Sequence, residues 1–346
     1  MTESPAPRRP PHVAARVERA VQALVEPRLR RRGWRPAVVP YTGYGAEGWV
    51  RVLARVLLLP PDWAQGEARD VRGWRAFLTA EPSGVPVEVR LGDRTHVVRT
   101  RRDGYVDVRL PADLAAGWTT AELTVEGRPP VEAALRVAGS ADTLGLVSDI
   151  DDTVIVTMLP RPLLAFWNAF VLKASARRPV PGMAELYRSV AAAHPELVVV
   201  YLSTGAWNTA PSIRAFLDRH GFPPGPLLMT DWGPTREGWF RSGADHKLAE
   251  LRRLLEDLPH VRWLLVGDDG QHDPSIYAEI ATAAPEAIEA VAIRQLSTGE
   301  QVLSHGSPNP RGGEKVARVV DHEVRAPDGY GLREELRRRG LLAGPG

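Results

Sequence analysis

The stretch L-G-L-V-S-D-I-D-D-T-V-I, at Leu144–Ile155, ends an apolar run with three carboxylates in four positions. These carboxylates belong to Asp149, Asp151 and Asp152. A short apolar run of this kind is typical of a buried strand. Like charges at the end of a buried strand repel one another unless a cation lies among them. The stretch therefore predicts a strand that ends in a charged, cation-holding site.

Three further apolar runs follow along the chain, and helical patterns alternate with them. The four apolar runs cover residues 144–148, 197–202, 262–266 and 289–293, and the helical patterns lie near residues 184–193, 209–220, 246–257 and 274–283. Continuous apolar strands that alternate with helices predict a parallel sheet covered on both faces. We therefore expect an α/β domain over residues 141–304.

Polar side chains also follow the second and third apolar runs, where a parallel sheet binds its ligands beyond the carboxyl ends of its strands. They are Ser203 and Thr204 after the second run, Asp268, Asp269 and Asp273 after the third, and Lys247 in the helix before the third. Each residue alone is typical of a turn, a helix cap or a solvated helix face. Their joint order and placement favour a shared chemical role.

The residue types in this set suit a metal and a phosphate. Carboxylate oxygens are the ligands that Mg²⁺ prefers, and Mg²⁺ often also takes a phosphate oxygen of the substrate. A hydroxyl and a lysine beside that metal stabilise a phosphoryl group. A carboxylate can in addition act as the nucleophile and form an aspartyl-phosphate.

The chain before this domain, over residues 36–140, has short runs in which apolar and polar residues alternate. The runs lie at residues 50–57, 87–91, 95–100, 105–110, 121–126 and 131–137. Period-two runs separated by Gly, Pro and Asp turns predict an antiparallel, sandwich-like β-domain. Within it, G-Y-G-A-E-G at 43–48 matches the glycine spacing of dinucleotide-binding loops. A strand-like segment follows it instead of a helix, so we expect a glycine-rich β-turn.

The two ends of the chain differ from these domains. Residues 1–35 comprise a Pro- and Arg-rich start, which we expect to be disordered, and a basic amphipathic helix from residue 12 to residue 32. That helix either lies on an anionic membrane or packs on the domain behind it. Residues 305–346 form a polar tail with one short helix near Leu332–Arg339.

One more apolar segment, at residues 158–174, lies between the first and second strands of the parallel sheet. Its apolar side chains recur at helical spacing. The helix is either buried against the sheet or forms a lid or membrane-contact element near the site. Three tryptophans are candidates for the border of that site, and they are Trp207, Trp232 and Trp239.

Composition excludes several classes of function. The chain of 346 residues has no cysteine, which excludes disulfides, thiol catalysis and cysteine-based zinc sites. Its formal net charge of +2 is too small to indicate a nucleic-acid partner. No apolar stretch approaches the length of about 18 residues that spans a membrane. The first residues lack the apolar core of a signal peptide, so we expect a cytoplasmic protein, in peripheral membrane contact if its substrate is a lipid.

Four motifs carry a resemblance to a known family. D-I-D-D-T, S-T-G, H-K-L and G-D-D-G-Q-H-D, which begin at Asp149, Ser203, His246 and Gly267, resemble the motifs of the haloacid dehalogenase-like phosphohydrolases. The longer matches H-K-L-A-E-L-R-R-L-L and L-L-V-G-D-D-G-Q-H-D-P-S-I-Y resemble the catalytic domain of the actin-patch-type phosphatidate phosphatases. P-Y-T-G-Y-G at 40–45 resembles the region before that domain. The resemblance covers about residues 36–300 and implies a Rossmann-like parallel sheet of the haloacid dehalogenase type.

The resemblance implies a role for each motif residue. Asp149 attacks the phosphorus, and Asp151 protonates the leaving alkoxide and then deprotonates the hydrolytic water. Ser203 donates to the phosphoryl oxygens, and Lys247 neutralises the charge of the nucleophile and the phosphate. The implied Mg²⁺ ligands are Asp149, the backbone carbonyl of Asp151 and Asp268, with Asp273 in support. The chain departs from the family, which more often has Ser-Asn at Ser203-Thr204 and Asp-Ser-Gly at Asp268-Asp269-Gly270.

Three functions stay open at this stage. The leading one is a Mg²⁺-dependent phosphatase that hydrolyses phosphatidate to diacylglycerol. The second is a phosphatase for a soluble phosphomonoester. The third is a membrane- or protein-binding module with a vestigial site, against which the complete motif set argues. The sequence indicates no oligomeric state.

Overall fold

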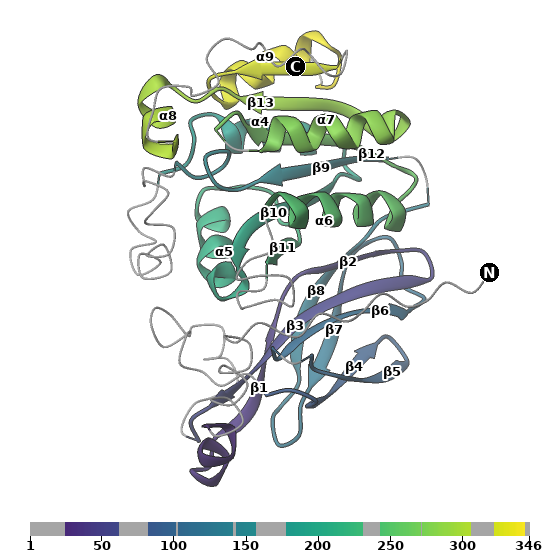
Figure 1. Cartoon of the computed structure of the whole chain (residues 1–346). Helices are drawn as coiled ribbons and strands as arrows, with labels where there is room; N and C mark the ends of the chain where they lie inside the picture. Colours follow the sequence, from purple (N-terminus) through teal and green to yellow (C-terminus); the bar gives the residue numbers. More distant parts are fainter. Residues whose placement is uncertain are drawn as a thin grey trace, which may run out of the picture.

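The structure, a computed structural model, describes residues 25–61, 82–101, 103–140, 143–156, 178–230, 243–270, 272–305 and 322–342. These residues form two separate sheets (Figure 1). The first sheet uses the chain before residue 140, and the second uses the chain from residue 143 onward. Within these described ranges, helices accompany only the second sheet, apart from a short helix at residues 25–31.

The first sheet has eight strands. They are β1 (Arg35–Pro40), β2 (Gly43–Ala46), β3 (Trp49–Leu59), β4 (Pro86–Leu91), β5 (Arg94–Arg99), β6 (Tyr105–Pro111), β7 (Gly117–Thr124) and β8 (Val131–Val137). Their order is β1-β3-β2-β8-β7-β4-β5, with β6 paired to β3. All pairs are antiparallel except β2 with β8, which are parallel. The expected antiparallel domain is therefore a mixed sheet, linked by hydrogen bonds from end to end.

The apolar alternation of these strands builds one core. Inward-facing side chains of β3, β4, β6, β7 and β8 share a single buried cluster. β3 is buried along nearly its whole length, because Val50, Val52, Ala54 and Val56 face this cluster while Leu53 faces the core of the second sheet. The glycine-rich segment at 43–46 is strand β2, and residues 47–48 turn the chain into β3, so no helix follows the glycines as a dinucleotide-binding loop requires.

The second sheet is parallel throughout. Its strands are β9 (Thr143–Asp149), β10 (Val198–Ala206), β11 (Leu227–Thr230), β12 (Val261–Asp268), β13 (Ile288–Arg294) and β14 (Glu323–Ala326), in the order β11-β10-β9-β12-β13-β14. The four strands expected from the apolar runs are confirmed as β9, β10, β12 and β13. β11 and β14 were not predicted, because each is only four residues long: the apolar run of β11 is limited to three residues, and β14 reads E-V-R-A.

The helices of the second sheet agree with the expected pattern, except that the helix at residues 298–305 was not predicted. They are α4 (Met183–Ala193), α5 (Ala210–Arg219), α6 (Gly243–Asp257), α7 (Asp273–Ala283), α8 (Thr298–His305) and α9 (Gly329–Arg338), and the short 3₁₀ turns are η4 (Trp207–Thr209) and η5 (Pro285–Ala287). α4 to α7 bury apolar side chains in one core with β9, β10, β12 and β13. α9 begins at an Asp328 cap, whose side chain accepts from the Gly331 amide at 2.9 Å. In Figure 1, α6 lies between the two sheets.

Several predictions concern residues outside the described ranges. These are the disordered start, most of the basic helix, the segment at 158–174, Trp232 and Trp239. Trp207 is described, and its side chain is buried. Among the described helices, none is both long and apolar enough to cross a bilayer.

Candidate active site

The carboxyl ends of three neighbouring strands bring the predicted residues together. β9 lies in the middle of this group, with β10 on one side and β12 on the other. Asp149 ends β9 and Asp268 ends β12, while Ser203 lies in β10 directly after Leu202, which pairs with Asp149. Parallel strands align their carboxyl ends at one edge, where open α/β sheets bind ligands. The placement expected from the sequence is therefore confirmed for these strand ends.

The chain after β9 folds into a tight loop. The amides of Val154 and Ile155 donate to the carbonyl of Ile150 at 2.9 and 3.0 Å, and the amide of Asp152 donates to the carbonyl of Ile155 at 2.8 Å. Asp152 has φ of 60°, and within the described ranges it is the one residue other than glycine with a positive φ. A left-handed backbone costs energy for most residues but less for Asp. This turn keeps Asp149 and Asp151 at the sheet edge.

Lys247 joins two of the predicted carboxylates. Its Nζ atom lies 2.6 Å from Oδ1 of Asp149 and 2.6 Å from Oδ1 of Asp273. All three side chains are almost fully buried. Asp273 is the first residue of α7, and the Lys247 side chain comes from the early part of α6. The lysine expected beside Asp149 is therefore in contact with that carboxylate.

Burial and charge set the ionisation of these groups. Burial raises the pKa of Asp149, Lys247 opposes this shift, and the net result is a pKa well above the ordinary value. Burial also lowers the pKa of Lys247, but the charges of Asp149 and Asp273 outweigh it and the net shift is upward. The ammonium thus stays charged and compensates only part of the carboxylate charge around it. A cation would supply the rest.

Asp268 provides an oxygen for such a cation. Its Oδ1 atom accepts from the Gly270 amide at 2.6 Å, whereas no hydrogen-bond partner among the described residues reaches its buried Oδ2 atom. Burial raises the pKa of Asp268 well above its usual value, and the charges of Asp273 and Asp149 add to this. A buried carboxylate oxygen without a partner is costly unless an ion or a water molecule satisfies it.

Carboxylates of Asp149, Asp268 and Asp273 form a compact acidic triad. One oxygen of each lies within 4.8 Å of the others, and all three residues are buried. Together with the open Oδ2 atom of Asp268, this donor set fits a metal ion. A Cβ atom on Gly267 would lie 2.6 Å from Oδ2 of Asp273, so only glycine leaves room for the triad here. Asp151 is half-buried and outside the triad, and its predicted carbonyl ligand stays a prediction.

Ser203 lies in the last part of β10, at the same edge. It is buried, and its Oγ atom accepts from the Gly205 amide at 3.0 Å. Thr230 Oγ1 donates to the carbonyls of Thr204 and Gly205 at 2.8 and 3.1 Å, which ties this end of β10 to β11. A Cβ atom on Gly243 would lie 2.7 Å from Thr204 Cγ2, so this end of β10 also touches the start of α6.

Asp269 has a different task from its neighbour Asp268. Its Oδ1 atom accepts from the Leu296 amide at 2.8 Å, and its own amide donates to the Arg294 carbonyl at 3.0 Å. These contacts hold the chain after β13 against the chain after β12. Asp269 therefore supports the loop instead of joining the acidic triad.

Arg294 is a residue that the sequence analysis missed. Its buried guanidinium donates to the Asp152 carbonyl at 2.6 Å and to Oε1 of Glu300 at 2.6 Å. It therefore braces the loop that carries Asp151 from the end of β13. The available signal was a single arginine that ends an otherwise apolar run, A-V-A-I-R at 290–294.

These observations define an α/β protein with a buried carboxylate and lysine site at the carboxyl edge of a parallel sheet. Residues 144–295 match the family model described as "Phosphatidate phosphatase APP1, catalytic domain". The four motifs and every predicted site residue lie within this range. The actin-patch-type family predicted from the motifs is therefore confirmed for this part of the chain, while the wider haloacid dehalogenase-like placement stays a prediction.

Curated relatives agree with this match. "Phosphatidate phosphatase APP1" of Saccharomyces cerevisiae is 29% identical over 167 residues, which are 47% of this chain and 28% of that protein. An uncharacterized protein of Schizosaccharomyces pombe is 23% identical over 154 residues, 44% of this chain and 25% of that protein. The chain spans about a quarter of the length of these relatives.

Solved structures add little to this. A carbohydrate acetylesterase from Xanthomonas citri aligns with 73% of this chain and 66% of its own, at 9% identity and a TM-score of 0.27. A likeness this low bears on neither fold nor function.

Proposed function

We propose that the chain is a Mg²⁺-dependent phosphatase that hydrolyses the phosphomonoester of phosphatidate through an aspartyl-phosphate on Asp149. One observation carries the proposal: Lys247 bridges Asp149 and Asp273 beside the unpartnered oxygen of Asp268. This arrangement supplies a nucleophile, a fixed positive charge and a metal ligand set at one point. The match of residues 144–295 to phosphatidate phosphatase catalytic domains supports the choice of substrate.

In the first step, an oxygen of Asp149 attacks the phosphorus, and the bond from phosphorus to the glycerol oxygen breaks. Asp151 transfers its proton to that oxygen, which leaves as the hydroxyl of diacylglycerol. Lys247 keeps the Asp149 carboxylate oriented, and its charge opposes the effect of burial on the pKa of Asp149. Ser203 donates a hydrogen bond from its hydroxyl group to a phosphoryl oxygen. Bound Mg²⁺ would neutralise the phosphate and part of the carboxylate charge.

In the second step, Asp151 as a carboxylate takes a proton from water, and the water oxygen attacks the phosphorus. The bond from phosphorus to the Asp149 oxygen breaks, which restores the carboxylate and releases inorganic phosphate. The half-buried position of Asp151 fits a group that must meet both the leaving oxygen and water. The acidic triad, by contrast, is closed to solvent, as a metal site in a dry pocket requires.

Phosphatidate is a membrane lipid, so the proposal includes peripheral contact with a membrane and a cytoplasmic location. The substrate is tested by measuring phosphate release from phosphatidate in detergent micelles, with glycerol 3-phosphate as the soluble counterpart. We expect the rate of phosphate release to rise with the mole fraction of phosphatidate in the micelle. We also expect kcat/KM for glycerol 3-phosphate to be lower by about 100-fold or more. Equal kcat/KM values for both compounds would indicate a phosphatase for soluble phosphomonoesters.

A further inference from the structure

The segment Y-T-G-Y at Tyr41–Tyr44 lies where the first sheet meets the parallel sheet. The Tyr41 ring stacks on Trp207 with 4.6 Å between ring centroids. The Thr42 hydroxyl accepts from Arg214 of α5 at 2.9 Å, and the Tyr44 hydroxyl donates to Oδ2 of Asp257 of α6 at 2.8 Å. Consecutive residues of one short segment thus touch three elements of the parallel sheet domain. We call these contacts, together with those of Arg51 below, the inter-sheet interface.

Two glycines make this close approach feasible. A Cβ atom on Gly43 would lie 2.2 Å from the Arg51 carbonyl oxygen, and one on Gly45 would lie 2.4 Å from the Trp49 carbonyl oxygen. Neither position can take a side chain unless β2 moves away from β3. The glycine spacing that resembles a dinucleotide-binding loop therefore has a packing cause, and it places the tyrosines of this segment against the parallel sheet domain.

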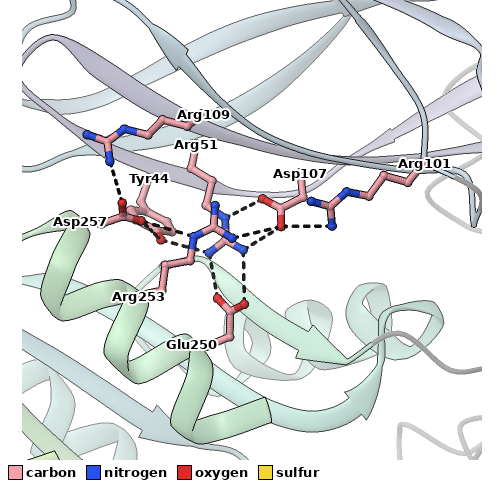
Figure 2. Close-up of polar contacts among 8 residues, drawn as sticks. All are labelled: Tyr44, Arg51, Arg101, Asp107, Arg109, Glu250, Arg253 and Asp257. Atoms are coloured by element: carbon pink, nitrogen blue, oxygen red, sulfur yellow. Dashed lines mark hydrogen bonds and ion pairs between the residues drawn. The ribbon is translucent and has the colours of Figure 1, made fainter. Parts of the chain in front are cut away.

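Arg51 is the buried centre of the interface (Figure 2). Its guanidinium binds both oxygens of Asp107, at 2.7 and 2.9 Å, within the first sheet. Its Nη1 atom donates to Oε2 of Glu250 on α6 at 2.8 Å and to the Tyr44 hydroxyl at 3.0 Å. The side chain is only 3% exposed. A planar guanidinium with several partners holds each of them in a fixed direction.

Other contacts extend the interface along α6. Arg109 of β6 pairs with Oδ1 of Asp257 at 2.9 Å, and Arg253 faces Asp107 at 3.4 Å. Glu250, Arg253 and Asp257 follow one another at spacings of three and four residues, so they line one face of α6. Figure 2 shows these three side chains directed at the strands that carry Tyr44, Arg51 and Asp107. The first sheet thus fixes both the rotation of α6 and its position along its axis.

The same helix carries Lys247, one turn before Glu250. A shift of α6 along its axis would move Nζ of Lys247 away from Asp149 and Asp273, which it contacts at 2.6 Å. Trp207, which stacks on Tyr41, follows the S-T-G motif of Ser203 by a few residues. The helix that carries Lys247 and the segment that follows Ser203 therefore both contact the first sheet.

We infer that Arg51 is a positioning residue for the active site: through Glu250 it sets α6, and so it places Lys247 against Asp149. The first sheet is then a working part of the catalytic unit. The expected effect of Arg51 on turnover rests on the proposed function. The expected effect of Arg51 on the position of Lys247 can be measured without turnover.

The kinetic test compares two interface variants with a matched control in the full chain. Glu250→Gln removes the negative charge that pairs with Arg51. Arg51→Lys keeps the positive charge but loses the planar guanidinium that binds several partners at once. Arg136→Met breaks another contact between the sheets, the bond from Arg136 to the Glu196 carbonyl at 3.0 Å. Glu196 precedes β10, at the end of the parallel sheet opposite the site. We expect kcat on phosphatidate to fall about ten-fold in both interface variants, with KM within about two-fold and kcat unchanged in the control.

The second readout needs no turnover. The chain has three lysines, Lys173, Lys247 and Lys315, so selective ¹³C-lysine labelling gives a simple NMR spectrum in which Lys247→Arg identifies the Lys247 signal. We expect Glu250→Gln and Arg51→Lys to shift this signal and Arg136→Met to leave it in place. The inference is wrong if the interface variants leave both kcat and the signal unchanged, or if the control alters them equally. A wild-type chain that releases no phosphate would contradict the proposed function alone, and the signal would still decide the role of Arg51.

Discussion

Lys247 places its Nζ atom 2.6 Å from Oδ1 of Asp149, and both side chains are buried. The same nitrogen lies 2.6 Å from Oδ1 of Asp273, so one positive charge serves two carboxylates. Asp268 adds a third carboxylate within 4.8 Å, and its Oδ2 atom has no partner among the described residues. Three carboxyl groups thus face one ammonium group, and a bound cation would help to keep all three carboxyl groups ionised. This imbalance leads to the first prediction.

Mg²⁺ should stabilise the folded chain through Asp268. At a concentration about 100-fold above its Kd, a ligand adds about 2.7 kcal/mol to the free energy of unfolding. We expect Mg²⁺ to raise the Tm of the wild type, and Asp268→Asn to abolish most of that rise because a neutral amide replaces a charged ligand. Asp269→Asn is the control, since its side chain can still accept from the Leu296 amide and lies outside the triad. An equal rise in Tm for Asp268→Asn would remove Asp268 from the metal site.

The contrast between Asp268 and Asp269 also shows a feature of the site that the sequence alone does not predict. The pattern at 262–273 predicts a strand followed by carboxylates, and both features are present. Spacing alone does not reveal that Asp269 binds the Leu296 amide while Asp273, four residues later, turns back to Lys247. That difference depends on the loop after β12 and on the helical turn that starts at Asp273. Neither is encoded in an apolar pattern.

The same limit applies to contacts between distant parts of the chain. The strands with continuous apolar runs and the four main helices were predicted, because periodicity is local. β11 and β14 were missed because a strand of four residues is too short for its pattern to be told from that of a loop. The partners of Arg51 and Arg294 were missed for a related reason: Glu250 and the Asp152 carbonyl become neighbours only after the sheets have formed.

Asp151→Asn should trap the covalent intermediate. Without a carboxylate to take a proton from water, the second step becomes slow. The first step slows less if the substrate has a good leaving group, because such a group departs without a proton from Asp151. We expect steady-state turnover to fall by about 100-fold or more, with phosphate bound to Asp149 after an acid quench, as seen by peptide mass spectrometry. The double variant with Asp149→Asn is the control and should carry no phosphate. Phosphate on another residue would contradict Asp149 as the nucleophile, and no phosphate in Asp151→Asn would contradict the covalent route.

Asp107 should make stability depend on pH. Burial raises its pKa, but the hydrogen bonds and charge of Arg51 outweigh burial, and the net shift is downward. A carboxylate with a lowered folded-state pKa stabilises the fold above its ordinary pKa of about 4, and this stabilisation disappears as pH falls through the folded-state value. We expect Asp107→Asn to reduce the free energy of unfolding by about 2 kcal/mol near neutral pH, because the buried Arg51 loses one of its two carboxylate partners and keeps only Glu250.

The check is urea unfolding of the wild type and Asp107→Asn from about pH 7 to about pH 3, where the difference between them should shrink. Asp93→Asn, on the exposed turn between β4 and β5, is the control and should match the wild type at neutral pH. A difference that stays constant or widens toward acid pH would contradict the role of Asp107 as an ionised partner of Arg51.

Position 152 should tolerate glycine better than alanine. Its φ of 60° lies in the left-handed region, which glycine adopts freely and alanine adopts at a cost of about 1–2 kcal/mol. We expect Asp152→Gly to be more stable than Asp152→Ala by about that amount in thermal unfolding. The same two substitutions at the exposed Asp113, where φ is not positive, should show no advantage for glycine. Equal stability of the two Asp152 variants would mean that the loop after β9 does not hold this conformation.

The most direct test of the account is phosphate release from phosphatidate in mixed micelles, measured with Mg²⁺, with EDTA, and for Asp149→Asn. Asp113→Asn, at an exposed carboxylate in the connection between β6 and β7, controls for the substitution itself. We expect release that needs both Mg²⁺ and Asp149, with Asp149→Asn slower by a factor on the order of 10⁴ and still folded by circular dichroism. Release that persists in Asp149→Asn, or that is unaffected by EDTA, would contradict a metal-dependent phosphatase with Asp149 as its nucleophile.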